Sequence, residues 1–111
     1  MSVKIDATGE VVTAYLSGEI DHHNAVEMRE AIDAALKTYG PSLIVLDFSD
    51  VTFMDSSGIG LVMGRYRVSR PYGSQILITN TPTSIYKVMR LAGIEKLAKL
   101  NKGNDNNEKR A

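Results

Sequence analysis

Two kinds of spacing between hydrophobic residues alternate along this chain, one typical of strands and one typical of helices. In residues 3–18, β-branched side chains gather in two short runs around Thr8 and Gly9, which predicts a β-hairpin with its turn at these residues. Apolar runs follow at residues 43–46 and within "QILIT", residues 75–79. Because such runs are typical of strands covered on both faces, we expect these two segments in the centre of a sheet.

Three segments next to these runs carry apolar residues at helical spacing. The first covers residues 24–40, where Asn24 and Glu27 form a capping box and Gly40 with Pro41 ends the helix. The residues expected to face inward from this helix are Ala25, Met28, Ile32, Ala35, Leu36 and Tyr39.

The second helix is predicted to begin near Asp55 or Ser56, and Pro71 with Gly73 separates it from the next strand. Its expected inward face consists of Ile59, Val62, Met63 and Tyr66. In the third helix, Thr81 is the predicted cap, Pro82 the first residue, and Gly93 the stop. The expected inward face of the third helix consists of Ile85, Val88, Met89 and Ala92.

The order of these elements predicts the fold class. A last short strand is expected at residues 97–100, and residues 101–111 are expected to form a polar, disordered C-terminal tail, since they lack the apolar side chains that offset the entropy of ordering. Alternating strands and helices predict one α/β domain at residues 1–100, with a mixed, mostly parallel central β-sheet packed with α-helices. The N-terminal hairpin supplies an antiparallel edge strand.

Composition limits the possible functions. The chain has 111 residues, 43% of them hydrophobic, which suits one domain with one core. Lys plus Arg and Asp plus Glu both number 13, so no overall charge draws the protein to nucleic acid or to an anionic membrane. The lack of cysteine excludes disulfides and thiolate chemistry. Neither a signal peptide nor an apolar run of membrane-spanning length is present, which favours a cytoplasmic protein.

Residues 53–67, "FMDSSGIGLVMGRYR", are unusual because a helix with a buried stripe begins at a bare, polar turn. Asp47 is expected to mark the carboxyl end of the central strand, and the helix follows near Asp55. Ser56 and Ser57 are therefore expected at the carboxyl edge of the sheet, where ligands and partners commonly meet open α/β folds.

Three glycines follow these serines, and each costs a helix interior roughly 1 kcal/mol relative to alanine. Gly58, Gly60 and Gly64 either let the helix pack tightly on the sheet or leave its first turn open to another macromolecule. A phosphate on a serine here would face unpaired backbone N–H groups and the positive end of the helix dipole. It would also place about −1.5 to −2 charge beside Asp55 and Asp21, and so repel a partner fitted to the bare serine.

Hydrolase and nucleotide-binding chemistry have weaker support. Ser56 or Ser57 with a histidine and an aspartate has the ingredients of a catalytic triad, but the G-x-S-x-G pattern of a nucleophile elbow is absent. The segment "GIGLVMGR" lacks the lysine and hydroxyl residue of a P-loop, and its glycine spacing differs from the dinucleotide fingerprint.

Two other polar clusters have simple structural interpretations. His22 and His23 are adjacent and therefore poorly placed to share a metal ion, so we expect them in a polar loop ahead of the first helix. Arg65, Arg67 and Arg70 form either a basic ridge or a solvated helix face, and the second reading is the more common.

Three segments of the chain resemble a known family. They are "SGEIDHHNA" at residues 17–25, "LIVLDFSDVTFMDSSGIGLVMGRYR" at residues 43–67, and "RLAGI" at residues 90–94. Together they are similar to the anti-sigma factor antagonists, whose fold is the STAS domain, and above all to the sporulation-type members. The likeness runs from the first strand to about residue 100, and the D-S-S-G segment is its most specific part.

The resemblance implies a regulatory switch rather than an enzyme. Family members of this kind bind an anti-sigma factor that is itself a serine kinase, release its sigma factor, and are inactivated when that kinase phosphorylates them. A protein serine phosphatase resets the switch, and no cofactor, metal, membrane or direct nucleic-acid contact is implied. The phosphoacceptor is the serine after the aspartate of D-S-S-G, here Ser56. The implied partner-binding residues are Asp21, Asp55, Ser56, Ser57, Gly58 and Ile59.

Other readings stay open at this point. The chain also fits an antagonist in a general stress sigma pathway, or a STAS scaffold or ligand-sensing module without a phosphorylation cycle. A small serine hydrolase is a third possibility. One departure from close relatives is that residues 101–111 lack the apolar stripe of their last helix, which predicts either an uncovered patch on one face of the sheet or an extra mobile tail.

Overall fold

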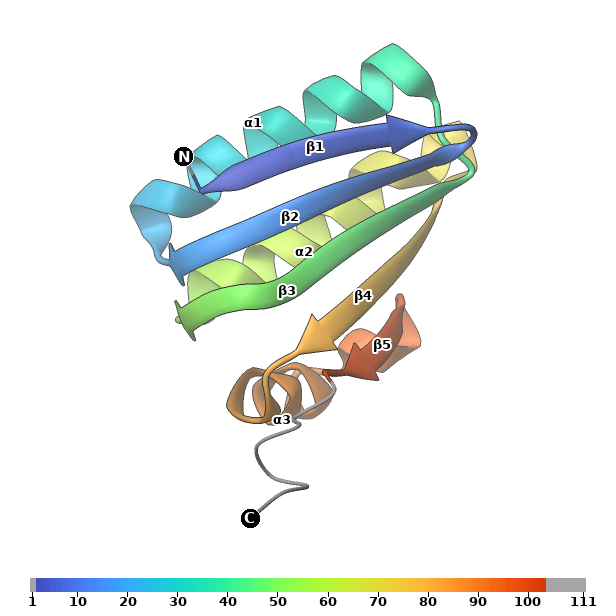
Figure 1. Ribbon diagram of the computed structural model, residues 1–111. Helices are drawn as coiled ribbons and strands as arrows, with labels where there is room; N and C mark the ends of the chain where they lie inside the picture. Colours follow the sequence, from blue (N-terminus) through green and yellow to red (C-terminus); the bar gives the residue numbers. More distant parts are fainter. Residues whose placement is uncertain (1, 104–111) are drawn as a thin grey trace.

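A computed structural model describes residues 2–103 of the chain and gives the bounds of its elements (Figure 1). The strands are β1 (Val3–Thr8), β2 (Val11–Ile20), β3 (Leu43–Met54), β4 (Gln75–Thr81) and β5 (Lys99–Lys102). The helices are α1 (His22–Tyr39), α2 (Ser56–Ser69) and α3 (Thr83–Leu91), with 3-10 turns η1 (Arg70–Tyr72) and η2 (Ile94–Lys96).

The five strands form one sheet in the order β1-β2-β3-β4-β5. β1 pairs antiparallel with β2, and the remaining neighbours are parallel. Gly9, with a φ of 60°, supplies the left-handed backbone that the turn between β1 and β2 requires. The predicted α/β class, the N-terminal hairpin and the mostly parallel sheet are therefore confirmed.

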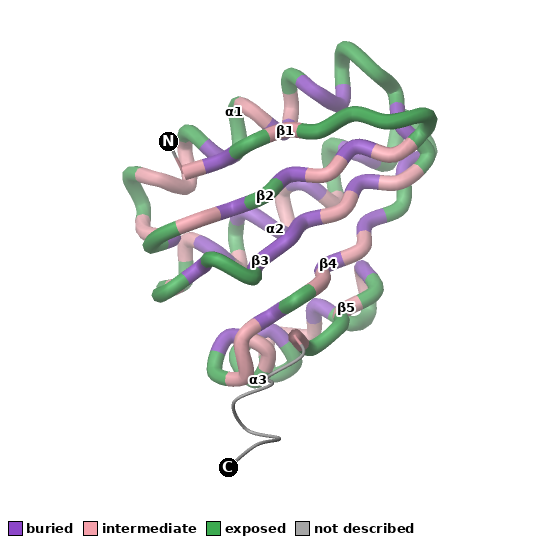
Figure 2. Tube along the Cα trace, in the orientation of Figure 1, coloured by how far each residue is buried: buried purple, intermediate pink, exposed green. Residues whose placement is uncertain are grey.

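The helices α1 and α2 lie side by side behind the sheet, and the core lies between them and the strands (Figure 1). Buried positions alternate with more exposed ones along β2 and β4 and in the first half of β3 (Figure 2). The buried face includes Leu16, Ile44, Leu46, Phe48 and Ile78. On the front of β1, β2 and β3 no helix of the described part covers the sheet (Figure 1). Tyr15, between the buried Ala14 and Leu16 of β2, is 44% exposed.

The start of α1 differs from the prediction. Asp21, not Asn24, is the N-cap, because its carboxylate Oδ1 accepts a hydrogen bond of 2.8 Å from the backbone N–H of Asn24. His22 and His23 therefore form the first turn of α1 instead of a loop. At the other end Gly40 stops the helix in the left-handed conformation, as expected. Tyr39 was predicted to face inward but is 58% exposed, so its polar ring end stays in water.

The prediction that β3 ends at Asp47 is wrong, since β3 continues to Met54. Pairing with β4 does stop where Asp47 faces Thr79, whereas pairing with β2 goes on. Beyond this point, the Asp47 carboxylate makes hydrogen bonds in place of the strand pairing between β3 and β4. Its Oδ1 accepts from the N–H and hydroxyl of Ser49 at 2.9 and 2.6 Å, and its Oδ2 accepts from Asn80 Nδ2 at 2.9 Å. A buried carboxylate thus closes the gap between the diverging strands.

Several predictions for the C-terminal third of the chain also differ from the structure. Thr81 does not cap α3: it is buried in β4, and Pro82 occupies the cap position. Val88 was predicted to face the core but is 46% exposed, while Ile85 and Met89 are buried as expected. The last strand is Lys99–Lys102, so residues 101 and 102 belong to the sheet and not to the predicted tail. The rest of that tail, from residue 104, lies outside the described residues, and the domain boundary at residue 100 stays a prediction.

The buried face of α2 is wider than its apolar spacing indicates. Val62 is fully buried, but Ile59, Met63 and Tyr66 are only partly buried against the core. The other buried residues of α2 are Gly58, Leu61, Arg65 and Ser69. The reason is that α2 packs against α1 as well as against the sheet, so a second arc of the helix is removed from water.

Candidate partner-binding site

The carboxyl ends of β2 and β3 bring Asp21 and Asp55 to the same edge of the sheet. Ile20 and Met54 are register partners, and the N–H of Asp55 donates a 3.1 Å hydrogen bond to the carbonyl oxygen of Ile20. Each aspartate directly follows one of these paired strands. Asp21 and Asp55 are 34 positions apart in the sequence, but this pairing places them on the same surface.

Asp21 and Asp55 start α1 and α2 in the same way. Both have extended backbone, and the Asp55 Oδ1 atom accepts from the N–H of Ser57 at 2.8 Å, as Asp21 does for α1. The carboxylates therefore satisfy free N–H groups and complement the positive ends of two helix dipoles. The helix was predicted to begin near Asp55 or Ser56, and Asp55 is its cap while Ser56 is its first residue.

Ser56 is the first residue of α2 and is exposed, whereas Ser57 is half-buried. A group added to the Ser56 hydroxyl would therefore project toward solvent and would lie at the N-terminus of a 14-residue helix. Within residues 2–103 neither serine is hydrogen-bonded to a histidine, so the nucleophile–base pair of a hydrolase is not assembled there.

The three glycines of α2 have different surroundings. A Cβ atom on Gly58 would lie 2.2 Å from Met54 Cγ and 2.3 Å from Met54 Sδ, so this glycine makes room for the Met54 side chain against the first turn of α2. A Cβ atom on Gly60 or Gly64 would meet nothing within 4 Å. Tight packing therefore explains Gly58 but does not explain Gly60 and Gly64.

Two residues near this edge differ in how far they are available to a partner. Ile59, predicted in the partner surface, is half-buried against the core and offers only part of its side chain. Phe53 was not predicted there, yet it is 50% exposed, two residues before Asp55. An aromatic residue next to the polar D-S-S-G turn is the signal in the sequence that points to it.

The predicted arginine cluster is not a single surface. Arg65 is 4% exposed, and its Nε atom lies 2.8 Å from Oδ1 of Asp33 on α1. Burial lowers the pKa of Arg65, the charge of Asp33 opposes this effect, and Arg29 adds to it. Arg70, in contrast, is exposed, lies 5.2 Å from the centre of the Tyr66 ring, and donates to the Tyr66 hydroxyl.

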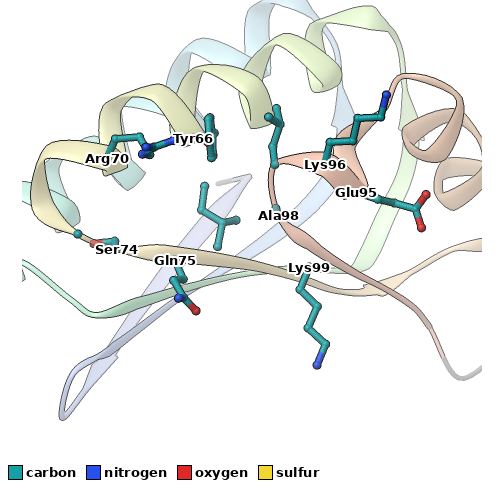
Figure 3. Close-up of a pocket in the computed structure, with 11 residues that line it drawn as sticks. Tyr66, Arg70, Ser74, Gln75, Glu95, Lys96, Ala98 and Lys99 are labelled. Atoms are coloured by element: carbon teal, nitrogen blue, oxygen red, sulfur yellow. Dashed lines mark hydrogen bonds between the residues drawn. The ribbon is translucent and has the colours of Figure 1, made fainter.

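A separate cleft lies far from this edge. It has a volume of about 520 Å³ and is formed by the end of α2, the start of β4, and the η2–β5 segment. Figure 3 shows that Glu95 and Lys99 point away from the hollow and that Arg70 is turned toward Tyr66. No set of polar groups converges in this cleft, and we therefore place the candidate site at the Ser56 edge.

A metal site and a membrane-spanning helix are both absent from the described residues. Residues 2–103 hold no group of three or more His, Cys, Asp or Glu side chains arranged to bind a metal ion. Over the same residues, no helix combines the length and apolar character needed to cross a membrane.

A model of the STAS domain family matches residues 2–105. Because the match spans most of the chain, the chain belongs to the STAS domain family. Within this family it groups with the anti-sigma factor antagonists. It is 34% identical over 87 residues to the anti-sigma F factor antagonist of Lysinibacillus sphaericus, which covers 78% of this chain and 74% of that protein.

Solved structures agree with this placement. The anti-sigma factor antagonist SpoIIAA in its unphosphorylated form superimposes with a TM-score of 0.79, at 26% identity over 96% of this chain and 91% of SpoIIAA. The phosphorylated form of the Bacillus cell fate determinant SpoIIAA gives a TM-score of 0.71 at 28% identity, covering 97% of both chains. The family resemblance drawn from the sequence is thus confirmed.

Proposed function

We propose that this protein is an anti-sigma factor antagonist controlled by phosphorylation of Ser56. In the unphosphorylated state it binds an anti-sigma factor that is a serine kinase, and the bound anti-sigma factor releases its sigma factor. The kinase then transfers a phosphate to Ser56, the complex dissociates, and a protein serine phosphatase restores the free hydroxyl. The cycle takes place in the cytoplasm and regulates transcription in a sporulation pathway. The proposed contact surface consists of Asp21, Asp55, Ser56, Ser57, Gly58 and Ile59.

The observation that carries this proposal is the position of Ser56. It is exposed, it is the first residue of α2, and it follows Asp55 at the edge shared with Asp21. A kinase active site reaches such a hydroxyl without unfolding the chain. The names of two relatives support the proposal. One is an anti-sigma F factor antagonist, and the other, SpoIIAA, has been solved in an unphosphorylated and a phosphorylated form.

The switch is expected to act by charge and bulk at the contact surface. A phosphoserine carries about −1.5 to −2 charge near neutral pH. At Ser56 this charge adds to Asp55 and Asp21, while the nearby helix N-terminus tolerates it. A partner surface that is complementary to the bare edge is then repelled, and the fold itself changes little.

The direct test is intact-mass spectrometry after incubation with ATP and the anti-sigma factor kinase from the same genome. We expect one added phosphate, located on Ser56 by fragmentation, and its removal by the cognate phosphatase. An unmodified protein beside a kinase that phosphorylates another substrate would contradict the proposal. That result would favour a STAS module that binds partners without a phosphorylation cycle.

A further inference from the structure

A small groove runs between the outer surfaces of α1 and α2, beside the proposed phosphorylation site. Its volume is about 330 Å³, and α2 lines one side with Ser57, Gly60 and Gly64. These residues are three and four positions apart and so lie along one face of the helix. The groove is also lined by His22, Ala25, Val26 and Arg29 of α1 and by Leu61 and Arg65 of α2. Because Ser57 belongs to the proposed contact surface, the groove continues that surface.

The fold does not need the two glycines that keep this groove open. A Cβ atom on either Gly60 or Gly64 would meet no atom within 4 Å. Each glycine inside a helix lowers the stability of the helix relative to alanine. No contact within the described residues requires a glycine at either position, and the space that the two glycines leave open is available to a partner group.

The groove also carries more positive than negative charge. Arg65 lies at its floor with 5% of its side chain exposed. Its Nε atom forms an ion pair with Asp33 Oδ1 at 2.8 Å, and the charge of Asp33 supports that of Arg65. Arg29 is close enough to disfavour the charge of Arg65 and forms no ion pair in the described part of the chain. The described residues therefore provide one carboxylate for Arg65 and none for Arg29.

We propose that this groove receives an acidic segment of the anti-sigma factor, with one of its carboxylates between Arg29 and Arg65. The inference rests on the proposed function and extends its contact surface along α2. A carboxylate only accepts hydrogen bonds and pairs strongly with guanidinium groups, so it supplies the counter-ion that Arg29 lacks in the described part of the chain and adds to the one that Arg65 has in Asp33. Gly60 and Gly64 let the backbone of the segment come close to α2. The volume lies at the low end of small-molecule pockets, roughly 300–1,000 Å³, and suits a protein side chain.

Calorimetric titration with the anti-sigma factor from the same genome tests the charge of the groove. We expect Arg29→Glu to weaken binding about tenfold or more and Arg29→Gln to weaken it less, because reversal adds repulsion to the loss of attraction. The matched control is Lys37→Glu, an equal charge change on an exposed residue of the same helix, which should bind like the original chain. Binding of Arg29→Gln should also depend less on salt.

The shape of the groove is tested separately. Gly60→Leu fills the groove without a clash inside the chain and should weaken binding about tenfold. Ala34→Leu adds bulk at an exposed site of α1 outside the groove and is the control. Thermal unfolding by circular dichroism verifies that each variant is folded.

The outcomes separate this inference from the proposed function. If the original chain does not bind the anti-sigma factor, the proposed function itself fails. If it binds and both Arg29→Glu and Gly60→Leu bind equally well, the groove inference is overturned while the function stands. If the original chain binds and Arg29→Glu and Gly60→Leu bind more weakly while their controls do not, both the groove inference and the proposed function are supported.

Discussion

The Nε atom of Arg65 lies 2.8 Å from Oδ1 of Asp33, and this ion pair joins α2 to α1 behind the sheet. The two ends of the pair are unequal, since 5% of the Arg65 side chain and 34% of the Asp33 side chain are exposed. The carboxylate therefore keeps contact with water while the guanidinium does not. Removing one partner should have a different effect from removing the other.

We expect Asp33→Ala to lower the free energy of unfolding by about 1–3 kcal/mol, because it leaves the buried charge of Arg65 without a counter-ion. Arg65→Met fills a similar volume without a charge and should change stability by less than about 1 kcal/mol. Urea unfolding of both variants measures the difference, with Glu30→Ala, an exposed acid on α1, as the control. A larger loss for Arg65→Met than for Asp33→Ala would show that the pair stabilises the fold.

The buried carboxylate of Asp47 leads to a second prediction. It accepts three hydrogen bonds from Ser49 and Asn80 beyond the point where β3 and β4 stop pairing. Asp47→Ala should cost about 1–3 kcal/mol, since it leaves these donors unpaired. Asp50→Ala removes an exposed carboxylate of the same strand and should stay within about 0.5 kcal/mol. Equal losses in urea unfolding would contradict this role of Asp47.

These residues also show what the sequence could and could not reveal. The hairpin, the order of elements and the stop of α1 at Gly40 depend on local signals, namely turn residues, spacing and backbone conformation, and were predicted correctly. The continuation of β3 past Asp47 depends on β2, a strand far away in the sequence. The burial of Arg65 similarly depends on α1. Contacts of this kind leave no local signal.

In the candidate site too, features set by local sequence were predictable and features set by distant contacts were not. The Asp55 cap and the exposed Ser56 were predictable because both are set by the strand-to-helix turn itself. Asp21 was expected near that turn from family resemblance, but its role as the cap of α1 was missed because two histidines follow it. The different reasons for Gly58 and Gly60 needed the neighbouring atoms to be known.

The surroundings of these two glycines give a third prediction. Gly58→Ala should lower stability by about 1–3 kcal/mol, because the new methyl group would overlap Met54. Gly60→Ala meets only open space and should raise stability by up to about 1 kcal/mol through helix propensity. Thermal unfolding compares the two. In Gly58→Ala/Met54→Ala, the overlap is relieved, so the combined loss should be smaller than the sum of the single losses.

The last prediction concerns the proposed switch at Ser56. Ser56→Ala should keep the fold, bind the anti-sigma factor and escape inactivation by ATP and kinase, since it lacks the hydroxyl proposed to receive the phosphate. Ser56→Asp places one negative charge beside Asp55 and should bind about tenfold more weakly. Surface plasmon resonance measures both affinities, and Ser84→Asp on the exposed side of α3 is the matched control. Equal affinities of Ser56→Ala and Ser56→Asp would refute an electrostatic block.

In that case, phosphorylated protein should be compared with Ser56→Asp, because a phosphate has both more charge and more bulk than a carboxylate. If the phosphorylated form also binds as tightly as Ser56→Ala, then neither charge nor size at this edge controls the complex.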